Sequence, residues 1–204
     1  MVVTKGLLAR VHAKPDKVDD VEAFLVSALS MARDEPLTTA WFALKFNRHE
    51  FGIFDVFADD TGRDAHLTGP IAVALMANAS TLLSEPPKIE KIDVLASHLA
   101  TLSTPVGANK ALLLTFAAKA GHSADVESFL QDAAALAAQE PGTLAWFAIR
   151  LPDGSYGIFD TFADNAGRFA HIAGRVPREL AMHALTLLGS FPDMSMVDVL
   201  AEKR

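Results

Sequence analysis

Three kinds of side chain that carry acid–base or anion chemistry lie close together in the sequence, and all three return 105 residues later. Histidine can transfer a proton near neutral pH, a carboxylate can orient it or act as a base, and arginine can stabilise an anion. We therefore take as candidate catalytic groups a histidine acid/base, an orienting aspartate and an anion-stabilising arginine from each half: His66, Asp55 and Arg63, and His171, Asp160 and Arg168.

Each of these residues also has a structural interpretation. Asp55 lies between phenylalanines on an apolar strand, where an unpaired carboxylate is costly, so an ion pair with Arg63 is the first alternative. His66 falls three residues after Arg63 on one helical face, and it can instead cap the helix or bond a carbonyl. Under this alternative the residues stabilise the fold and form no site.

A second set of residues could form the wall of a pocket. Tryptophan can stack on a flat aromatic ligand, and a neighbouring cation can balance an anion, although core packing is the alternative role for both tryptophans. The candidate substrate-binding residues are Trp41, Lys45 and Phe54, and Trp146, Arg150 and Phe159.

Composition excludes several classes of function. The 204 residues include 18 Lys and Arg against 25 Asp and Glu, so nucleic acid and anionic membranes have little electrostatic attraction to the chain. The absence of cysteine excludes disulfides, thiol catalysis and thiolate metal sites. No metal-ligand spacing, Walker loop or dinucleotide-binding glycine motif is present, so we expect neither a metal nor a cofactor. With no apolar run long enough for a signal peptide or a membrane span, we expect a cytoplasmic protein.

The chain consists of two copies of one unit. Between Leu7 and Ser97, 40 of 91 positions are identical to the residue 105 positions later, without a gap, so the copies have kept the length of every element. The stretch around Pro105 and Gly107 is typical of a linker. We expect repeats at residues 1–97 and 111–204, joined by a linker at 98–110.

Each copy has the pattern strand–helix–strand–strand–helix–strand. Apolar spacing predicts a helix over Asp19–Arg33, which Glu35-Pro36 ends as Glu140-Pro141 does in the second copy, and a hairpin in which Phe46 pairs with Phe51. A second helical region, which Asp59 and its counterpart Asp164 can cap, is interrupted at Gly69-Pro70. This order is that of the ferredoxin-like split unit. Both faces of the hairpin are largely apolar while two helices can cover only one, so the other face should meet the second copy. We therefore expect an α+β fold in which two ferredoxin-like repeats form one intrachain barrel that can hold a small ligand.

The residues resemble a known family. Gly-Ile-Phe-Asp-x-Phe at 52–57, followed by Gly-Arg-x-Ala-His-x-x-Gly at 62–69, resembles the antibiotic biosynthesis monooxygenase family, and both halves carry the pattern. The resemblance implies a dimeric α+β barrel, here in a tandem-fused form. The same superfamily includes cofactor-free oxygenases of phenolic polyketides, haem-degrading enzymes, and proteins with no known activity, so the resemblance specifies the fold better than the reaction.

The first functional hypothesis is a cofactor-independent monooxygenase of small aromatic or polyketide-like molecules. The alternative is a non-catalytic module on the same fold that binds a small apolar molecule or serves in assembly. Haem binding is a third option, and it is disfavoured because the first strands lack the asparagine that haem-degrading relatives use. Pairing of the pseudo-dimer into a larger homo-oligomer is left open.

Overall fold

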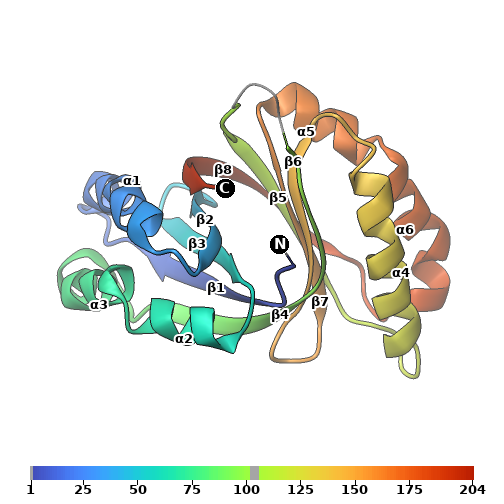
Figure 1. The fold of residues 1–204 in the computed structure, drawn as a ribbon, viewed down its shortest axis with the longest axis horizontal. Coiled ribbons are helices and arrows are strands. Elements are labelled where there is room, and N and C mark those ends of the chain that lie inside the picture. The colour runs from blue at the N-terminus through green and yellow to red at the C-terminus, as the bar shows by residue number, and fades with distance from the viewer. Residues whose placement is uncertain (1, 102–105) are drawn as a thin grey trace. The chain divides into compact units, whose positions relative to one another are not determined.

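A computed structural model describes residues 2–101 and 106–204 (Figure 1). Each repeat has four strands and three helices, because the second helical region is broken in two at Gly69-Pro70 and at Gly174-Arg175. The first repeat contains β1 (Lys5–His12), α1 (Val18–Asp34), β2 (Thr38–Lys45), β3 (Glu50–Phe57), α2 (Asp60–Leu67), α3 (Pro70–Leu82) and β4 (Lys88–Leu99). The second contains β5 (Lys110–Phe116), α4 (Ser123–Ala137), β6 (Thr143–Arg150), β7 (Tyr156–Phe162), α5 (Asn165–Ile172), α6 (Arg175–Leu187) and β8 (Asp193–Lys203).

The strands form a closed barrel in the order β1-β3-β2-β8-β5-β7-β6-β4. This confirms the expected α+β fold of two ferredoxin-like repeats. By contacts the chain divides into two compact units, which are not the same as the sequence repeats. Unit 1 comprises Met1–Ile92 with Val197–Arg204, and unit 2 comprises Asp93–Met196.

The difference between repeats and units comes from the last strand of each repeat. In unit 2, the end of β4 pairs with β6, with Asp93 opposite Arg150. In unit 1, the end of β8 pairs with β2, with Lys203 opposite Trp41. The expected linker at 98–110 begins within β4 and ends at the first residue of β5, and its residues 102–105 lie outside the described part of the chain.

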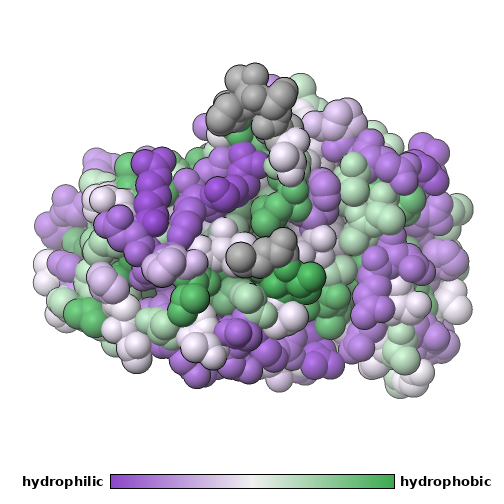
Figure 2. All heavy atoms as spheres, viewed as in Figure 1, coloured by the Kyte–Doolittle hydropathy of each residue, from purple (hydrophilic) through white to green (hydrophobic). Residues whose placement is uncertain are grey.

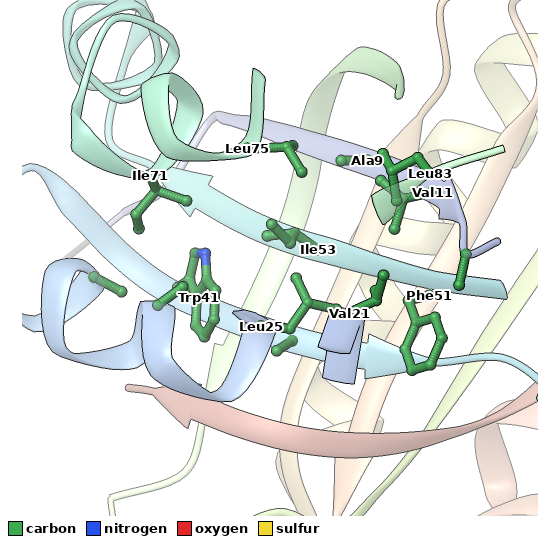
Figure 3. Packing of buried hydrophobic residues seen from close by; sticks show 14 residues of the cluster. Ala9, Val11, Val21, Leu25, Trp41, Phe51, Ile53, Ile71, Leu75 and Leu83 are labelled. Atoms are coloured by element: carbon green, nitrogen blue, oxygen red, sulfur yellow. The ribbon is translucent and has the colours of Figure 1, made fainter. Parts of the chain in front are cut away.

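Within each unit, helices cover one face of the strands (Figure 1). In unit 1 the apolar stripe of α1 is buried at spacings of four, three and four residues, as the sequence predicts. Ile71 and Leu75 come from α3 toward Ile53 on β3, and Trp41 of β2 lies in the same cluster (Figure 3). The buried residues of α1 are Val21, Leu25, Ala28 and Ala32.

The register of the first hairpin differs from the prediction. Phe51 pairs with Lys45, and Phe46 lies opposite Glu50, so the expected pairing of Phe46 with Phe51 is wrong by one residue. The turn is tighter because the side chain of Asn47 accepts hydrogen bonds from the backbone N–H groups of His49 and Glu50. A slip of one residue exchanges the faces of a strand, so it changes which side chains of β2 share a face with Asp55.

The surface carries both hydrophilic and hydrophobic residues. They are intermixed over the face drawn in Figure 2, and single exposed apolar side chains are normal in proteins. Among residues 2–101 and 106–204, no helix is long and apolar enough to cross a membrane.

Candidate functional site

A capped helix positions the histidine of each half. Asp59 accepts a hydrogen bond from the backbone N–H of Gly62 at 3.0 Å, which confirms the predicted N-cap of α2. Asp164 caps α5 in the same way through Gly167, at 2.9 Å. The cap fixes the first turn, and the buried side of α2 then carries His66 toward the sheet.

In unit 1, His66 bridges two carboxylates. Its Nε2 lies 3.1 Å from Oδ2 of Asp55 on β3, and its Nδ1 lies 2.6 Å from Oε2 of Glu35, the residue after α1. The hydroxyl of Thr38 donates a further hydrogen bond to Glu35 at 2.7 Å. The side chains of His66 and Asp55 are only 6% and 1% exposed, so this is a buried ionic chain. We call it the Asp–His–Glu chain.

Unit 2 repeats the Asp–His–Glu chain at matching positions. Nε2 of His171 lies 3.0 Å from Oδ2 of Asp160, and its Nδ1 lies 2.5 Å from Oε2 of Glu140. Thr143 donates to the same carboxylate of Glu140 at 3.0 Å. One oxygen of each aspartate, Oδ1, is buried without a hydrogen-bond partner among the described residues.

The electrostatics of the Asp–His–Glu chain favour a positively charged imidazole. Burial by itself lowers the pKa of His171, but the hydrogen bonds and charges of Asp160 and Glu140 outweigh it and raise the pKa to about 9. The same balance raises the pKa of His66 to about 9. Burial also raises the pKa of Asp160, against the opposing influence of the imidazolium. At neutral pH each histidine is therefore a cation that donates a hydrogen bond from both ring nitrogens.

The glutamates of the two Asp–His–Glu chains are not among the site residues predicted from the sequence. Glu35-Pro36 and Glu140-Pro141 are predicted only to end a helix, and 31 residues separate Glu35 from His66. Two signals were available: both copies retain a threonine three residues after the glutamate, and both retain a glycine three residues after the histidine. That glycine leaves room for the glutamate, because a Cβ on Gly174 would lie 2.7 Å from Oε1 of Glu140.

This close approach predicts that Gly174→Ala disturbs the Asp–His–Glu chain of unit 2. The new methyl group would also meet the carbonyl oxygen of His171 at 2.8 Å. We expect a loss of about 1–3 kcal/mol in the free energy of unfolding, the usual cost of overpacking, measured by urea denaturation. Gly142→Ala is the control, since its Cβ would meet its nearest neighbour at an ordinary 3.4 Å. Equal stability of the two variants would contradict the prediction.

The arginines do not join the histidine and the aspartate. Arg63 binds Asp60 and donates to the carbonyl oxygen of Ile92 at 3.2 Å. Arg168 donates to Asn165 at 2.7 Å and to the carbonyl oxygen of Ala111 at 3.3 Å. The alternative ion pair between Asp55 and Arg63 is therefore not the arrangement found, because the histidine one turn further along the helix reaches the aspartate first.

The tryptophans lie in the cores. Trp41 and Trp146 are fully buried beneath the helices, which is the core-packing role that the sequence left open. Because of the hairpin register, Trp41 pairs with Asp55 and shares its face, whereas Phe54 pairs with Phe42 on the opposite face. The structure therefore separates Phe54 from the wall predicted with Trp41, and it separates Phe159 from Trp146 in the same way.

The two predicted pocket cations, Lys45 and Arg150, each form ion pairs with carboxylates. Nζ of Lys45 lies 2.5 Å from Oε2 of Glu22 on α1. Arg150 lies 2.9 Å from Asp93 and 3.2 Å from Glu127. Both pairs are partly exposed ties between a strand and its neighbours, and they lie apart from the Asp–His–Glu chains.

Unit 2 contains a cavity of about 380 Å³ beside its Asp–His–Glu chain. It lies between the helix-covered face of β5 and β7 and the helices α5 and α6. Asp160 and His171 are its only charged lining residues, and all the others are apolar. A cavity of this size and character suits a small, largely apolar molecule with one polar group.

Each Asp–His–Glu chain has a linear geometry. The two carboxylates lie on opposite nitrogens of the imidazole and do not converge on one point. Among the residues that the structure describes, no group of three or more histidine and carboxylate side chains could hold a metal ion.

Comparisons with known proteins agree with this fold. A scan against protein-family models finds no match, and a search of curated proteins finds none either. A Fusobacterium nucleatum protein described as a "Putative monooxygenase" covers 100% of this chain with 95% of its own, at a TM-score of 0.86 and 13% identity. A Listeria monocytogenes ferredoxin-fold protein, described as related to antibiotic biosynthesis monooxygenases, covers 97% of this chain with 95% of its own, at a TM-score of 0.57 and 9% identity.

A third solved structure is closer in sequence and covers half of the chain. This Nitrosomonas europaea protein of unknown function is 51% identical over 52% of this chain and 97% of its own, with a TM-score of 0.44. Together the barrel and the two full-length matches define the fold. The chain has the fold of the antibiotic biosynthesis monooxygenase-like ferredoxin-fold proteins, with both halves of the barrel in one polypeptide, and the predicted resemblance is confirmed at the level of the fold.

Proposed function

We propose that the unit 2 cavity binds a small hydroxylated aromatic molecule and that the chain catalyses its oxygenation by dioxygen without a cofactor. The observation that carries this proposal is an apolar cavity of about 380 Å³ whose only charged lining residues belong to a buried Asp–His–Glu chain. The full-length structural neighbour described as a "Putative monooxygenase" supports the reaction class.

The geometry favours an exchange of the roles that the sequence suggested for histidine and aspartate. His171 is protonated at neutral pH and donates from both nitrogens to carboxylates, so it is a poor proton acceptor. Asp160 is the better base, because burial raises its pKa and it lines the cavity. His171 then orients Asp160 and balances its charge.

The reaction balances with the substrate as the sole electron donor. Loss of a phenolic proton to Asp160 makes the ring electron-rich, and the ring then gives electrons to dioxygen. One oxygen atom becomes a ring carbonyl, and the other leaves as water with the single hydrogen of that carbon and the phenolic proton. For the probe 1-naphthol the sum is 1-naphthol plus dioxygen giving 1,4-naphthoquinone plus water. No external reductant is needed.

Two probes that differ by one hydroxyl group, 1-naphthol and naphthalene, test the binding step. We expect 1-naphthol to bind about tenfold more tightly than naphthalene, or better still, because its hydroxyl can donate to a charged carboxylate. Asp160→Asn should remove most of this preference while leaving the affinity for naphthalene nearly unchanged. The measurement is calorimetric or fluorescence titration at pH 7. Equal affinity for both probes, or no binding of either, would overturn the binding proposal.

Oxygen uptake tests the chemical step. We expect one dioxygen consumed for each 1,4-naphthoquinone formed, and a large loss of rate in Asp160→Asn.

A second candidate function is a binding module without catalysis. It is favoured by the presence of the same Asp–His–Glu chain in unit 1, where it serves as a buried tie between β3, α2 and the end of α1. Tight binding of 1-naphthol without oxygen uptake would select this second candidate.

A further inference from the structure

Unit 1 contains a counterpart of the unit 2 cavity, and it is nearly filled. The hollow beside Asp55 and His66 measures about 30 Å³, against about 380 Å³ beside Asp160 and His171. Every residue that lines the smaller hollow has its repeat counterpart, 105 positions later, in the lining of the larger one. The two sites therefore share their wall and differ in the space it encloses.

Side-chain size at the shared positions does not explain the difference. Val176 is one methylene smaller than its counterpart Ile71, but Leu114 is larger than its counterpart Ala9. What differs is the extent of the cavity. In unit 2 it continues past Ala181 and Ala184 of α6, whereas the corresponding residues of α3 do not line the small hollow.

The closed state of unit 1 is visible in its core. Ile71 and Leu75 approach Ile53 from α3, and Leu83 packs into the same cluster (Figure 3). A separate hollow of about 260 Å³ lies on the far side of His66, against Glu35 and Pro36. Asp55 does not line that hollow, so it lacks the carboxylate on which the proposed chemistry depends.

The surface of unit 2 is also more apolar than that of unit 1 at matching positions. In unit 1, Lys91 and Asp64 form an ion pair at 3.2 Å. Their counterparts in unit 2 are Met196, 45% exposed, and Phe169, 55% exposed. Met194, which lies two residues before Met196 on the same face of β8, lines the cavity and is 48% exposed. The apolar lining thus continues to the surface, where an apolar ligand can enter.

We infer that the chain binds one ligand molecule, in unit 2 alone, and that unit 1 is a non-binding copy whose Asp–His–Glu chain serves the fold. The inference rests on the proposed function and assigns it to one of the two half-sites. It follows from two observations. Matching positions of the two repeats line cavities of about 380 and about 30 Å³, and two apolar side chains replace a surface ion pair beside the larger cavity.

The test is calorimetric titration of the full chain with 1-naphthol. We expect a stoichiometry of one. Ala184→Phe, which adds a ring to the cavity lining, should weaken binding at least tenfold and leave no second class of site. Leu185→Phe is the matched control, since Leu185 is the next residue on α6 and is 91% exposed, and its affinity should stay within twofold of the original.

The possible failures are distinguishable. No binding to the unsubstituted chain would refute the proposed function itself. A stoichiometry of two, or one tight site surviving in Ala184→Phe, would leave the proposed function standing and overturn the inference that unit 1 does not bind. Urea denaturation of both variants shows that any loss of binding is not a loss of folded protein.

Discussion

We expect His171→Ala to lower the free energy of unfolding by about 3–5 kcal/mol, the largest effect of any single substitution considered. The change removes the only cation between Asp160 and Glu140 and leaves two buried carboxylates near each other without compensation. His66→Ala should cost a similar amount, because the distances in unit 1 are nearly the same. Both losses are measured by urea denaturation at pH 7.

A control and a double variant make this prediction specific. His183, exposed on α6, should tolerate alanine within about 0.5 kcal/mol. Combining His171→Ala with Asp160→Asn should cost less than the sum of the two single changes, because the second change removes a charge that the first leaves unpaired. Additive costs, or a loss below about 1 kcal/mol in His171→Ala, would show that the Asp–His–Glu chain is not an ionic unit.

The fold was accessible from the sequence because its determinants are local and repeated. The apolar spacing of α1, the break at Gly69-Pro70 and the capping Asp59 each depend on residues within one or two turns, and each is found as predicted. The gapless 105-residue repeat then fixed the number and order of elements. The pairing of β4 with β6 and of β8 with β2 was not predicted, since it depends on contacts between distant strands.

Only part of the site could be predicted from the sequence. Residue type identified His66 and Asp55, but proximity in sequence suggested the wrong partner, Arg63. The correct partner depends on which side chain of α2 faces Asp55 once the helix packs on the sheet, and that is a tertiary contact between β3 and α2. Glu35 was missed because a glutamate before proline at a helix end already has a sufficient local explanation, and its contact with His66 spans 31 residues.

The duplication separates the stability of the Asp–His–Glu chain from its chemistry. Both units keep the Asp–His–Glu chain, but among the described residues only the aspartate of unit 2 lines a cavity of more than about 30 Å³. A stabilising role therefore predicts equal effects of matched substitutions in the two units, whereas a catalytic role predicts unequal effects on binding and turnover. Comparing His66→Ala with His171→Ala in both assays distinguishes the two within one polypeptide.

We expect the stability of the protein to fall as the pH rises from about 6.5 to about 9. The pKa of His66 and that of His171 are each raised from 6.5 to about 9, so the folded state holds these two protons more tightly than the unfolded chain does. The contribution of each histidine is fully present below pH 6.5 and is lost as the pH rises through 9. The shift corresponds to about 3 kcal/mol for each histidine. The pKa values of Asp55 and Asp160 are also raised, from 3.8, so their contribution has the same sign and is lost as the pH rises above 3.8.

Urea denaturation at a series of pH values from 6 to 9.5 measures this fall. His66→Gln leaves the chain of unit 2 intact, so it should halve the slope while also lowering stability at pH 6. Other groups that titrate in this range contribute equally to both proteins, and the difference between the two slopes therefore belongs to His66. A stability that is constant or rises over this range would mean that the histidines are neutral in the folded protein. In that case Nε2 of His171 could accept a proton, and the assignment of Asp160 as the base would have to be reversed.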